Sequence, residues 1–523
     1  MKQRKHKHRK QTHCRLATAL PFFSTVAALL CVAAYLVIPA SWQWNRAEAH
    51  ATRGDIVQDL VAPGRIDRRL IQALRTAPTS TQAAPIIITY HDIGRNKSPY
   101  TVAPEDFASQ MQMLHDAGWT TLSMADLGHW LDGEALPPKS VLVTFDDGAK
   151  GVWRYADPVF QRLGMRGVAF LITGFLDTSQ PYYMTWDEVQ DLANSGRWDL
   201  EAHTHLGHVK VPVDAAGTMK PFLTDPMWLK DQSRVETMPE WHARVYADLV
   251  ECKHQFELHD LPVPDYFAYP FSAHEAKDDN TAALDKMVNS LYRMAMLDDS
   301  TSLRVTSSRD VLARLIRRGD VTAGLGIDGL ASRILDASPL DPSQAQPLND
   351  PNGWVNNEGD PATIDLPSPN TAVFNSSAGQ EIDRDYRPVQ SSMWTNYTVD
   401  VDVAGFRPGD GSMAGVTVLK PSQHVAGQDA PHQIEISLHS NQYSINDRQN
   451  DSLSGIPLEF APTHHVHIEV TPTLATITID GAPPVTWPVA KEAPRGVGGG
   501  ISIWGYRDAA DSSPLVFSNM VIR

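Results

Sequence analysis

Residues 141–148 read VLVTFDDG, and this stretch decides the fold of the larger part of the chain. Five consecutive apolar or β-branched residues are typical of a strand that is buried on both faces of a parallel sheet. The two aspartates follow where that strand ends. Functional groups of parallel α/β domains gather at the carboxyl ends of the strands. The stretch therefore predicts a parallel sheet and the edge at which its chemistry lies.

Similar strands lie on either side of this stretch and alternate with helical patterns. Residues 86–90 (IIITY), 167–173 (GVAFLIT) and 198–202 (WDLEA) are predicted strands. A capping-box sequence at 185–188 (TWDE) opens one helix, and another is predicted over 239–258. Strands that alternate with helices predict an α/β domain with a parallel sheet, either open or closed into a barrel.

The pattern changes near residue 338. Residues 338–353 are rich in Pro, Asp, Gln and Asn and are predicted to be a linker. Beyond them apolar and polar residues alternate, as in 397–403 (YTVDVDV) and 475–479 (ATITI). This alternation predicts an antiparallel β-sandwich over residues 354–523.

The chain begins with a basic segment that is followed by an apolar one. Residues 1–15 carry seven Lys and Arg and no acidic residue, whereas residues 16–44 carry no charged side chain. The apolar run is long enough for a helix of about 20 residues to cross a membrane. We therefore predict a cytoplasmic tail, a transmembrane signal anchor over 16–44, a stalk over 45–84 and an extracytoplasmic body. The alternative is a secreted protein, cleaved near the small residues of 47–49.

Charge and cysteine content exclude some classes of function. The net charge is -16, and without the basic tail 38 basic residues face 61 acidic ones. A body with a net charge of −23 argues against a nucleic-acid partner. Cys252 is the only cysteine after residue 44, so the exported part holds neither an intramolecular disulfide nor a cysteine-built zinc site.

Ionisable residues cluster at three predicted strand ends: Asp146 and Asp147, His91, and the pair His203 and His208. One such end is usually a solvated loop, but three on one rim predict a site. Two histidines and one carboxylate are the ligand set of a catalytic zinc with a position left for water. A second aspartate could then take a proton, and His91 is the candidate acid for a leaving amine.

These motifs resemble the polysaccharide deacetylases, which are the NodB-homology or family-four carbohydrate esterases. VTFDDG at 143–148, the histidine pair and AYPF at 268–271 carry the resemblance, which covers about residues 85–318. It implies a distorted (β/α) barrel domain, assigned to residues 85–337, that hydrolyses acetyl groups with a divalent metal, for which zinc is expected. The resemblance implies that Asp147, His203 and His208 bind the metal and that Asp146 is the general base. The implied catalytic acid is His91. The implied substrate or oxyanion residues are Tyr269, Pro270 and Phe271.

Two features resemble the poly-β-1,6-N-acetylglucosamine deacetylases within this family. His208 lies five residues after His203, one more than usual, and His91 stands in a YHD motif. His205 fits neither spacing and is expected to lie outside the ligand set. Asp92 either orients His91 or caps a turn.

Two family motifs are absent. Phe267 and Ala268 stand where most members carry an arginine that orients the base, and Asp298 and Asp299 follow Leu297 where a leucine-x-histidine motif is usual. What orients the predicted base is therefore open.

The predicted sandwich resembles concanavalin-A-like or laminin-G-like modules, which often bind glycans through exposed aromatic side chains. The candidate glycan contacts are Trp394, Trp487, Trp504 and Tyr506, with core packing as the alternative for each. The sequence thus predicts a membrane-anchored, metal-dependent deacetylase that removes N-acetyl groups from an extracellular polysaccharide, a GlcNAc polymer. The polysaccharide and the membrane are its predicted partners. The alternatives are a peptidoglycan, chitin or xylan deacetylase, and a catalytically silent glycan-binding surface protein.

Overall fold

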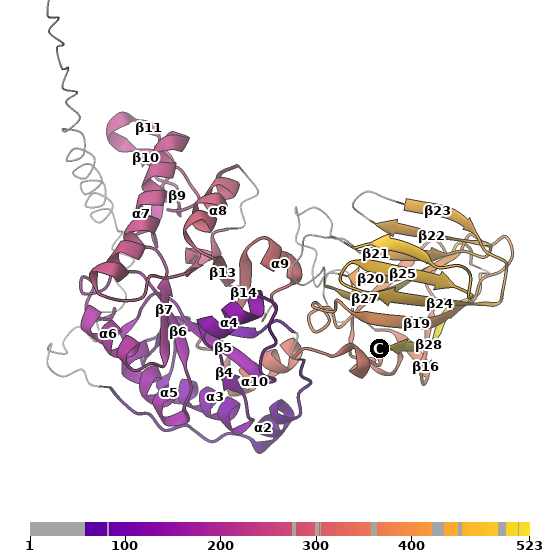
Figure 1. Ribbon diagram of the computed structural model, residues 1–523, viewed down its shortest axis with the longest axis horizontal. Coiled ribbons are helices and arrows are strands. Elements are labelled where there is room, and N and C mark those ends of the chain that lie inside the picture. The colour runs from indigo at the N-terminus through magenta and orange to yellow at the C-terminus, as the bar shows by residue number, and fades with distance from the viewer. Residues whose placement is uncertain are drawn as a thin grey trace, which may run out of the picture.

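The computed structural model places a barrel and a β-sandwich side by side along the long axis of the molecule (Figure 1). The described residues are 58–80, 83–274, 279–298, 303, 305–356, 363–420, 433–447, 452–489, 498–510 and 512–523. The predicted basic tail and transmembrane segment, residues 1–44, lie outside them. Among the helices of the described ranges, none is long and apolar enough to cross a membrane.

Within the described residues, eight parallel strands form the barrel sheet. In order across the sheet they are β1 (Ile86–Tyr90), β14 (Leu315–Asp320), β13 (Met294–Asp298), β12 (Tyr266–Ala268), β7 (Trp198–Ala202), β6 (Gly167–Leu171), β5 (Ser140–Phe145) and β4 (Thr120–Thr121). β1 pairs with both β14 and β5, so the sheet closes on itself, while β4 pairs with the start of β5. β7 and β12 share only the pair of Ala202 with Phe267 in the described ladder. This splayed ring confirms the predicted distorted (β/α) barrel.

Helices cover the outside of the barrel. In the described residues they are α2 (Arg68–Arg75), α3 (Pro104–Asp116), α4 (Met124–Leu131), α5 (Asp157–Leu163), α6 (Trp186–Asn194), α7 (Met238–Leu258), α8 (Asp279–Leu291), α9 (Ser308–Leu312) and α10 (Gly326–Ala337), with a π-turn η3 (Val152–Ala156) and a 3-10 turn η5 (Pro270–Ser272). Thr185 opens α6 in a capping box with Glu188, as predicted. The strand side chains Tyr90, Phe145 and Phe267 are fully buried in one apolar core.

Residues 58–80 pack against the barrel, which differs from the predicted stalk. Leu74 of α2 is fully buried in the barrel core, and α2 contacts α3 and α10. The backbone N–H of Gly64 donates to Ser109 of α3 at 2.7 Å. The apolar residues of this segment therefore contribute to the barrel.

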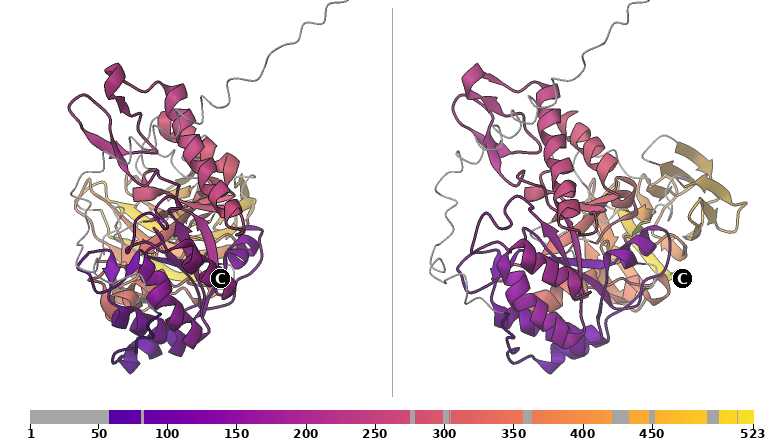
Figure 2. Two further views of the ribbon diagram at one scale, coloured as in Figure 1. Left: turned by 90° about the vertical axis from the view of Figure 1, so that its left-hand side faces the viewer. Right: turned by 60° about the vertical axis from the view of Figure 1, so that its left-hand side comes forward.

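A long insertion follows β7 at the end of the barrel where the predicted site lies. It contains two hairpins, made of β8 (Lys210–Pro212) with β9 (Met219–Pro221) and of β10 (Trp228–Leu229) with β11 (Arg234–Val235), before α7 begins. Figure 2 shows these hairpins and the start of α7 projecting from that end of the barrel. A parallel pair of β2 (Asp92–Ile93) and β3 (Thr101–Val102) follows β1 at the same end.

In the described residues the C-terminal part is built from two antiparallel sheets of seven strands each, which confirms the predicted sandwich. The first sheet has the order β15 (Trp354–Val355), β18 (Glu381–Tyr386), β27 (Gly500–Tyr506), β20 (Met413–Lys420), β21 (Ile434–Leu438), β22 (Gln442–Asp447) and β23 (Ser452–Pro457). The second has the order β16 (Asp365–Ser368), β17 (Thr371–Phe374), β28 (Leu515–Ile522), β19 (Tyr397–Ala404), β24 (Thr463–Val470), β25 (Leu474–Ile479) and β26 (Val485–Pro488). The turns η6 (Pro342–Gln344) and η7 (Pro347–Asn349) lie between α10 and β15.

Two of the four candidate glycan contacts are core residues. Trp394 and Trp487 are 4% and 6% exposed and belong to the apolar core of the sandwich. The indole N–H of Trp394 donates to the carbonyl of Leu340, and that of Trp487 faces Asp447. Their prediction as glycan contacts is therefore corrected to core packing.

Candidate active site

The turn after β5 presents the two adjacent aspartates in different environments. The backbone N–H of Asp146 donates to the carbonyl of Tyr90 at 2.9 Å, which ties the end of β5 to β1. Asp147 and Gly148 then take left-handed φ values of 73° and 84°. A left-handed aspartate is tolerated but uncommon, and such residues cluster at functional sites. The turn directs the two carboxylates to different partners.

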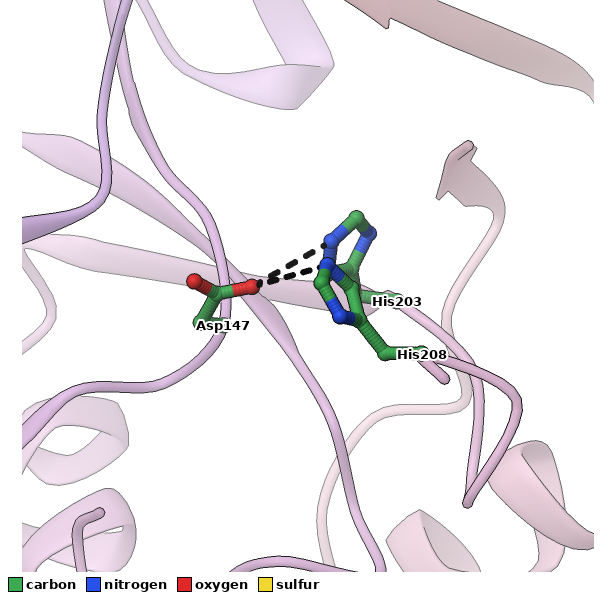
Figure 3. Close-up of side chains that lie close together, drawn as sticks. All are labelled: Asp147, His203 and His208. Atoms are coloured by element: carbon green, nitrogen blue, oxygen red, sulfur yellow. Dashed lines mark ion pairs between the residues drawn. The ribbon is translucent and has the colours of Figure 1, made fainter. Parts of the chain in front are cut away.

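Asp147, His203 and His208 converge on one point at the carboxyl ends of β5 and β7 (Figure 3). Oδ1 of Asp147 lies 3.5 Å from Nε2 of His203 and 3.3 Å from Nε2 of His208. This Oδ1 is buried and has no hydrogen-bond partner among the described residues. Three ligand atoms thus face one another across a space that a cation would fill.

The backbone around the two histidines holds their rings in place. Nδ1 of His203 donates to the carbonyl of Ala268 on β12 at 2.8 Å, which leaves the lone pair on Nε2. Asp248 of α7 accepts the backbone N–H groups of His205 and Leu206 at 3.1 and 2.7 Å. Thr204 takes a left-handed φ of 77°, which is rare for a β-branched residue. The loop between the histidines is therefore held in a strained conformation.

The pKa shifts of His208 and Asp147 suit metal binding. Burial lowers the pKa of His208 to about 4, although the charge of Asp147 opposes the shift, so its imidazole is neutral at pH 7. Burial alone would raise the pKa of Asp147, but the two facing imidazoles bring it below its usual value. Two neutral imidazoles and one carboxylate are the donor set of catalytic zinc sites. The residues present therefore fit a divalent cation.

Asp146 is held by Arg318, a residue that the sequence did not single out. The guanidinium on β14 contacts both carboxylate oxygens at 2.7 Å, and its side chain is fully buried. Burial alone would raise the pKa of Asp146, but the charge and hydrogen bonds of Arg318, together with the nearby His203 and His91, bring the pKa below its usual value. Arg318 thus supplies the orientation that Phe267 and Ala268 cannot.

His91 lies beside a second carboxyl group on β14. Its Nδ1 is 3.5 Å from Oδ1 of Asp320, and the side chains are 17% and 0% exposed. Burial lowers the pKa of His91, but Asp320, Asp147 and Asp146 outweigh it and raise the pKa to about 10. Asp298 at the end of β13 completes this group. Burial and the charge of Asp320 raise the pKa of Asp298 to about 7.

Comparisons with known proteins agree with this geometry. Residues 133–288 match the family model described as polysaccharide deacetylase, a range that includes β5, β7 and the loops carrying the three facing ligands. The chain carries a polysaccharide deacetylase domain. The chain is 23% identical over 248 residues to the poly-β-1,6-N-acetyl-D-glucosamine N-deacetylase of Escherichia coli (strain K12), with 44% of this chain and 36% of the relative covered.

The chain is also similar to a second curated relative and to a solved structure. The enzyme of the same name from Staphylococcus epidermidis is 29% identical over 114 residues, which covers 21% of this chain and 39% of the relative. The chain thus spans little more than a third of the length of these two curated relatives. The structure of a de-N-acetylase from Aggregatibacter actinomycetemcomitans matches 47% of this chain and 98% of its own, with 19% identity and a TM-score of 0.41.

The contacts of Asp92 and His205 show where these two open positions lie in the deacetylase domain. Asp92 is buried and accepts a hydrogen bond from Thr101 of β3 at 3.2 Å, and Asp320 faces His91. His205 pairs through Nδ1 with the Thr173 hydroxyl at 2.9 Å and lies outside the three facing ligands, as expected.

Exposed aromatic rings flank the site of the deacetylase domain. Phe271, in a left-handed conformation at φ 59°, lies with its ring centroid 4.5 Å from that of His208 and is 40% exposed. Tyr100, which is 46% exposed, lies 5.1 Å from the His91 ring. Tyr269 is buried instead, and its hydroxyl donates to Asp285. The predicted substrate segment 269–271 therefore presents Phe271 to the site, whereas the Tyr269 side chain is buried.

Proposed function

We propose that the protein is a metal-dependent deacetylase that hydrolyses N-acetyl groups of an extracellular GlcNAc polymer and releases acetate. The observation that carries the proposal is the convergence of three groups at one barrel end. These are the facing ligands Asp147, His203 and His208, the Asp146–Arg318 pair and the His91–Asp320 pair. Each group matches one requirement of amide hydrolysis: a Lewis acid, a base and an acid.

Asp146 acts as the general base. Its lowered pKa keeps it ionised at neutral pH, and the Arg318 fork fixes the direction of its oxygens. It accepts the proton of the attacking water as the new C–O bond forms at the acetyl carbonyl carbon. Asp147, His203 and His208 would hold a divalent cation, which would supply Lewis acidity and a lowered pKa for a bound water.

His91 acts as the general acid. Its raised pKa keeps it protonated, and its Nδ1 faces Asp320, so Nε2 is the ring nitrogen left for the substrate. Nε2 donates its proton to the amide nitrogen as the C–N bond breaks. The products are acetate and a free amine on the sugar.

The choice of a GlcNAc polymer rests on the relatives and on the motif layout. Both curated relatives described above are named for poly-β-1,6-N-acetyl-D-glucosamine. The five-residue interval from His203 to His208 and the YHD motif at His91 support the same substrate class. Tyr100 and Phe271 would contact the sugar rings on either side of the reacting unit, because sugar faces pack on exposed aromatic rings.

We further propose that the domain works outside the cytoplasm on a single membrane anchor. The support is the charge-free segment 16–44 behind a basic tail. Cleavage near 47–49 would instead release the same enzyme into the medium. Protease digestion of intact cells that removes the body while leaving a short membrane-bound fragment is the expected result for an anchored protein.

The test of the reaction is acetate release from β-1,6-linked N-acetylglucosamine oligomers. We expect release that stops with a chelator, returns with added zinc and is absent in Asp146→Asn. A parallel panel of chitin, peptidoglycan and acetylated xylan checks the substrate. Equal or faster release from a panel member would reassign the substrate, and no release from any acetylated glycan by the metal-loaded protein would overturn the proposal in favour of a glycan-binding role.

A further inference from the structure

The first sheet of the sandwich carries a polar face opposite its apolar one. Residues of even and odd number alternate across this sheet, and Ile501 and Ile503 of β27 face the core. Ser502 and Trp504 of β27 therefore point outward. The registers pair Trp504 with Asp383 of β18 and Ser502 with Asp385 of β18. The next strand, β20, is labelled beside β27 in Figure 1 and places Gly415 beside Trp504.

Two carboxylates on this face share one lysine. A bulge at the end of β20 turns Lys420 outward, and its Nζ lies 3.2 Å from both Asp383 and Asp385. The three side chains are 10–14% exposed. Burial raises the pKa of Asp385 to about 6, and Asp383 adds to the shift against the charge of Lys420. Among the described residues, these two carboxylates thus share one ammonium group.

Three buried polar atoms on this face have no hydrogen-bond partner among the described residues. They are Oδ1 of Asp383, Oγ of Ser502 and Nε1 of Trp504. An unsatisfied buried polar group is unfavourable, and native structures retain few of them. Three such atoms on the adjacent strands β18 and β27 indicate a place that a polar ligand completes.

Trp504 differs from the other buried tryptophans of the sandwich. Trp354, Trp394 and Trp487 belong to the apolar core of the sandwich. Trp504 is also buried, with only 7% of its surface exposed, but it belongs to neither apolar core. Its ring lies across Gly415, where a Cβ would come within 2.3 Å of the indole. The glycine therefore lets the indole lie flat on the sheet, beside the carboxylates.

The next outward-facing pair of β18 and β27 again places an acidic residue beside an aromatic one, closer to solvent. Glu381 of β18 pairs with Tyr506 of β27, and both side chains point outward because they lie two residues from Asp383 and Trp504. Glu381 is exposed and Tyr506 is half-buried. A row of three carboxylates on β18 thus runs beside a row of two aromatic rings on β27.

We propose that this face, named here the β18–β27 face and made of Glu381, Asp383, Asp385, Ser502, Trp504 and Tyr506, binds a glycan that carries free amino groups. Aromatic rings accept the apolar faces of sugars, and carboxylates accept hydrogen bonds from hydroxyl and ammonium groups. In the described part of the chain the two buried carboxylates of this face share Lys420, which favours a cationic chain over a neutral acetylated one. In the setting of the proposed deacetylase, on which this identification of the ligand rests, the occupant is the glucosamine polymer that the barrel produces.

The test is direct binding by calorimetry to the full chain carrying Asp146→Asn, which keeps the ligands chemically unchanged. The probes are glucosamine oligomers and N-acetylglucosamine oligomers of equal length and linkage. We expect at least about tenfold tighter binding of the free-amine oligomer, an advantage that shrinks at high salt. The combined substitutions Asp383→Asn and Asp385→Asn should weaken binding of that oligomer at least about tenfold.

The second sheet supplies a matched control. Asp400 and Asp402 of β19 are also two residues apart on an outward face, and His467 and His465 contact them at 2.7 and 2.8 Å. Replacing both with asparagine should leave binding unchanged. Trp504→Phe, checked by thermal unfolding, tests the ring in a form that retains an aromatic plane, and we expect weakened binding with an unchanged fold.

Several results would overturn the inference. Equal binding of the two oligomers, unchanged binding in the Asp383 and Asp385 variant, or an equal loss in the Asp400 and Asp402 control would each do so. Acetate release is measured separately in chains with native Asp146. Loss of binding with normal acetate release supports the β18–β27 face alone, whereas binding by a chain that releases no acetate would overturn the proposed reaction and leave this face standing.

Discussion

Two groups of histidine and aspartate residues lie at the same end of the barrel, and the pKa of a histidine is lowered in one group and raised in the other. The first contains Asp147, His203 and His208, and the second contains His91, Asp298 and Asp320. In both, the ligand atoms lie within 4.8 Å of one another. In the first, the pKa of His208 falls to about 4, whereas in the second the pKa of His91 rises to about 10.

The difference lies in the ratio of residue types and in their partners. Two imidazoles face one carboxylate in the first group, and a backbone carbonyl fixes the tautomer of His203. One imidazole faces two carboxyl groups in the second, where burial and Asp320 raise the pKa of Asp298 to about 7. The first group therefore offers lone pairs to a cation, and the second keeps protons. Two clusters of similar composition can thus be distinguished as metal-binding or proton-holding. The distinction rests on the ratio of imidazoles to carboxyl groups and on the partner of the second nitrogen of each imidazole ring.

The largest expected effect comes from removing a ligand of the first group. His203→Ala should reduce bound zinc from about one equivalent to near zero and lower kcat/KM by more than about 10⁴-fold, because both the Lewis acid and the activated water are lost. Metal content measured by mass spectrometry after desalting checks the first statement. A protein that retained a full equivalent of zinc would show that this group is not the metal site.

His91→Asn tests the other half of the comparison. We expect kcat/KM to fall by about 10³-fold, the usual scale for loss of a general acid, while zinc content stays near one equivalent. Substrates with a better leaving group than the sugar amine should lose less, because they need less protonation. Loss of zinc together with activity would place His91 among the ligands and remove the distinction between the two groups.

Sequence patterns predict many residues of this site, but they do not predict the charged residues that contact the base and the acid. Asp146, Asp147 and His203 follow strands of continuous apolar or mixed character, so their position at a rim was readable. Arg318 and Asp320 lie in LIRRGD, which forms β14 although it has no long apolar run that would predict a buried strand. The usable signal was two arginines followed by an aspartate near the end of the domain. The barrel buries these charges against one another, which no local pattern reveals.

Local sequence patterns likewise predict only those strands of the sandwich whose apolar and polar residues alternate. The alternation of 397–403 predicted β19 because one face is apolar. In EIDRDY at 381–386 the outward positions are acidic and one inward position is Arg384, so no clear alternation exists. All three tryptophans, Trp394, Trp487 and Trp504, are buried, but only Trp394 and Trp487 belong to the apolar core, and this difference follows from packing between the sheets, which composition cannot supply.

Arg318→Met probes how the base is held. The substitution leaves Asp146 buried without its partner, which should cost about 3–5 kcal/mol of unfolding free energy. Misdirection of the base should lower kcat by about 10²-fold at constant zinc content. Chemical denaturation and kinetics check the two effects. The double variant with Asp146→Asn should recover part of the stability but none of the activity, and recovered activity would contradict the role of Asp146.

Asp298→Asn should have the smallest effect and is the finest test of the comparison. Asp298, with a pKa raised to about 7, becomes negative above that pH and then favours protonated His91. Its replacement removes that charge, so the pKa of His91 falls and the alkaline limb of the kcat profile moves to lower pH, while the rate at pH 6 changes less than about tenfold. The direction in which the alkaline limb shifts is decisive. A carboxylate that only stabilised the backbone would, when replaced, lower the rate equally at every pH. Asp320→Asn, which removes the nearer carboxylate, should move the same limb further in the same direction. A shift to higher pH in either variant would mean that these carboxyl groups do not hold the proton of the acid.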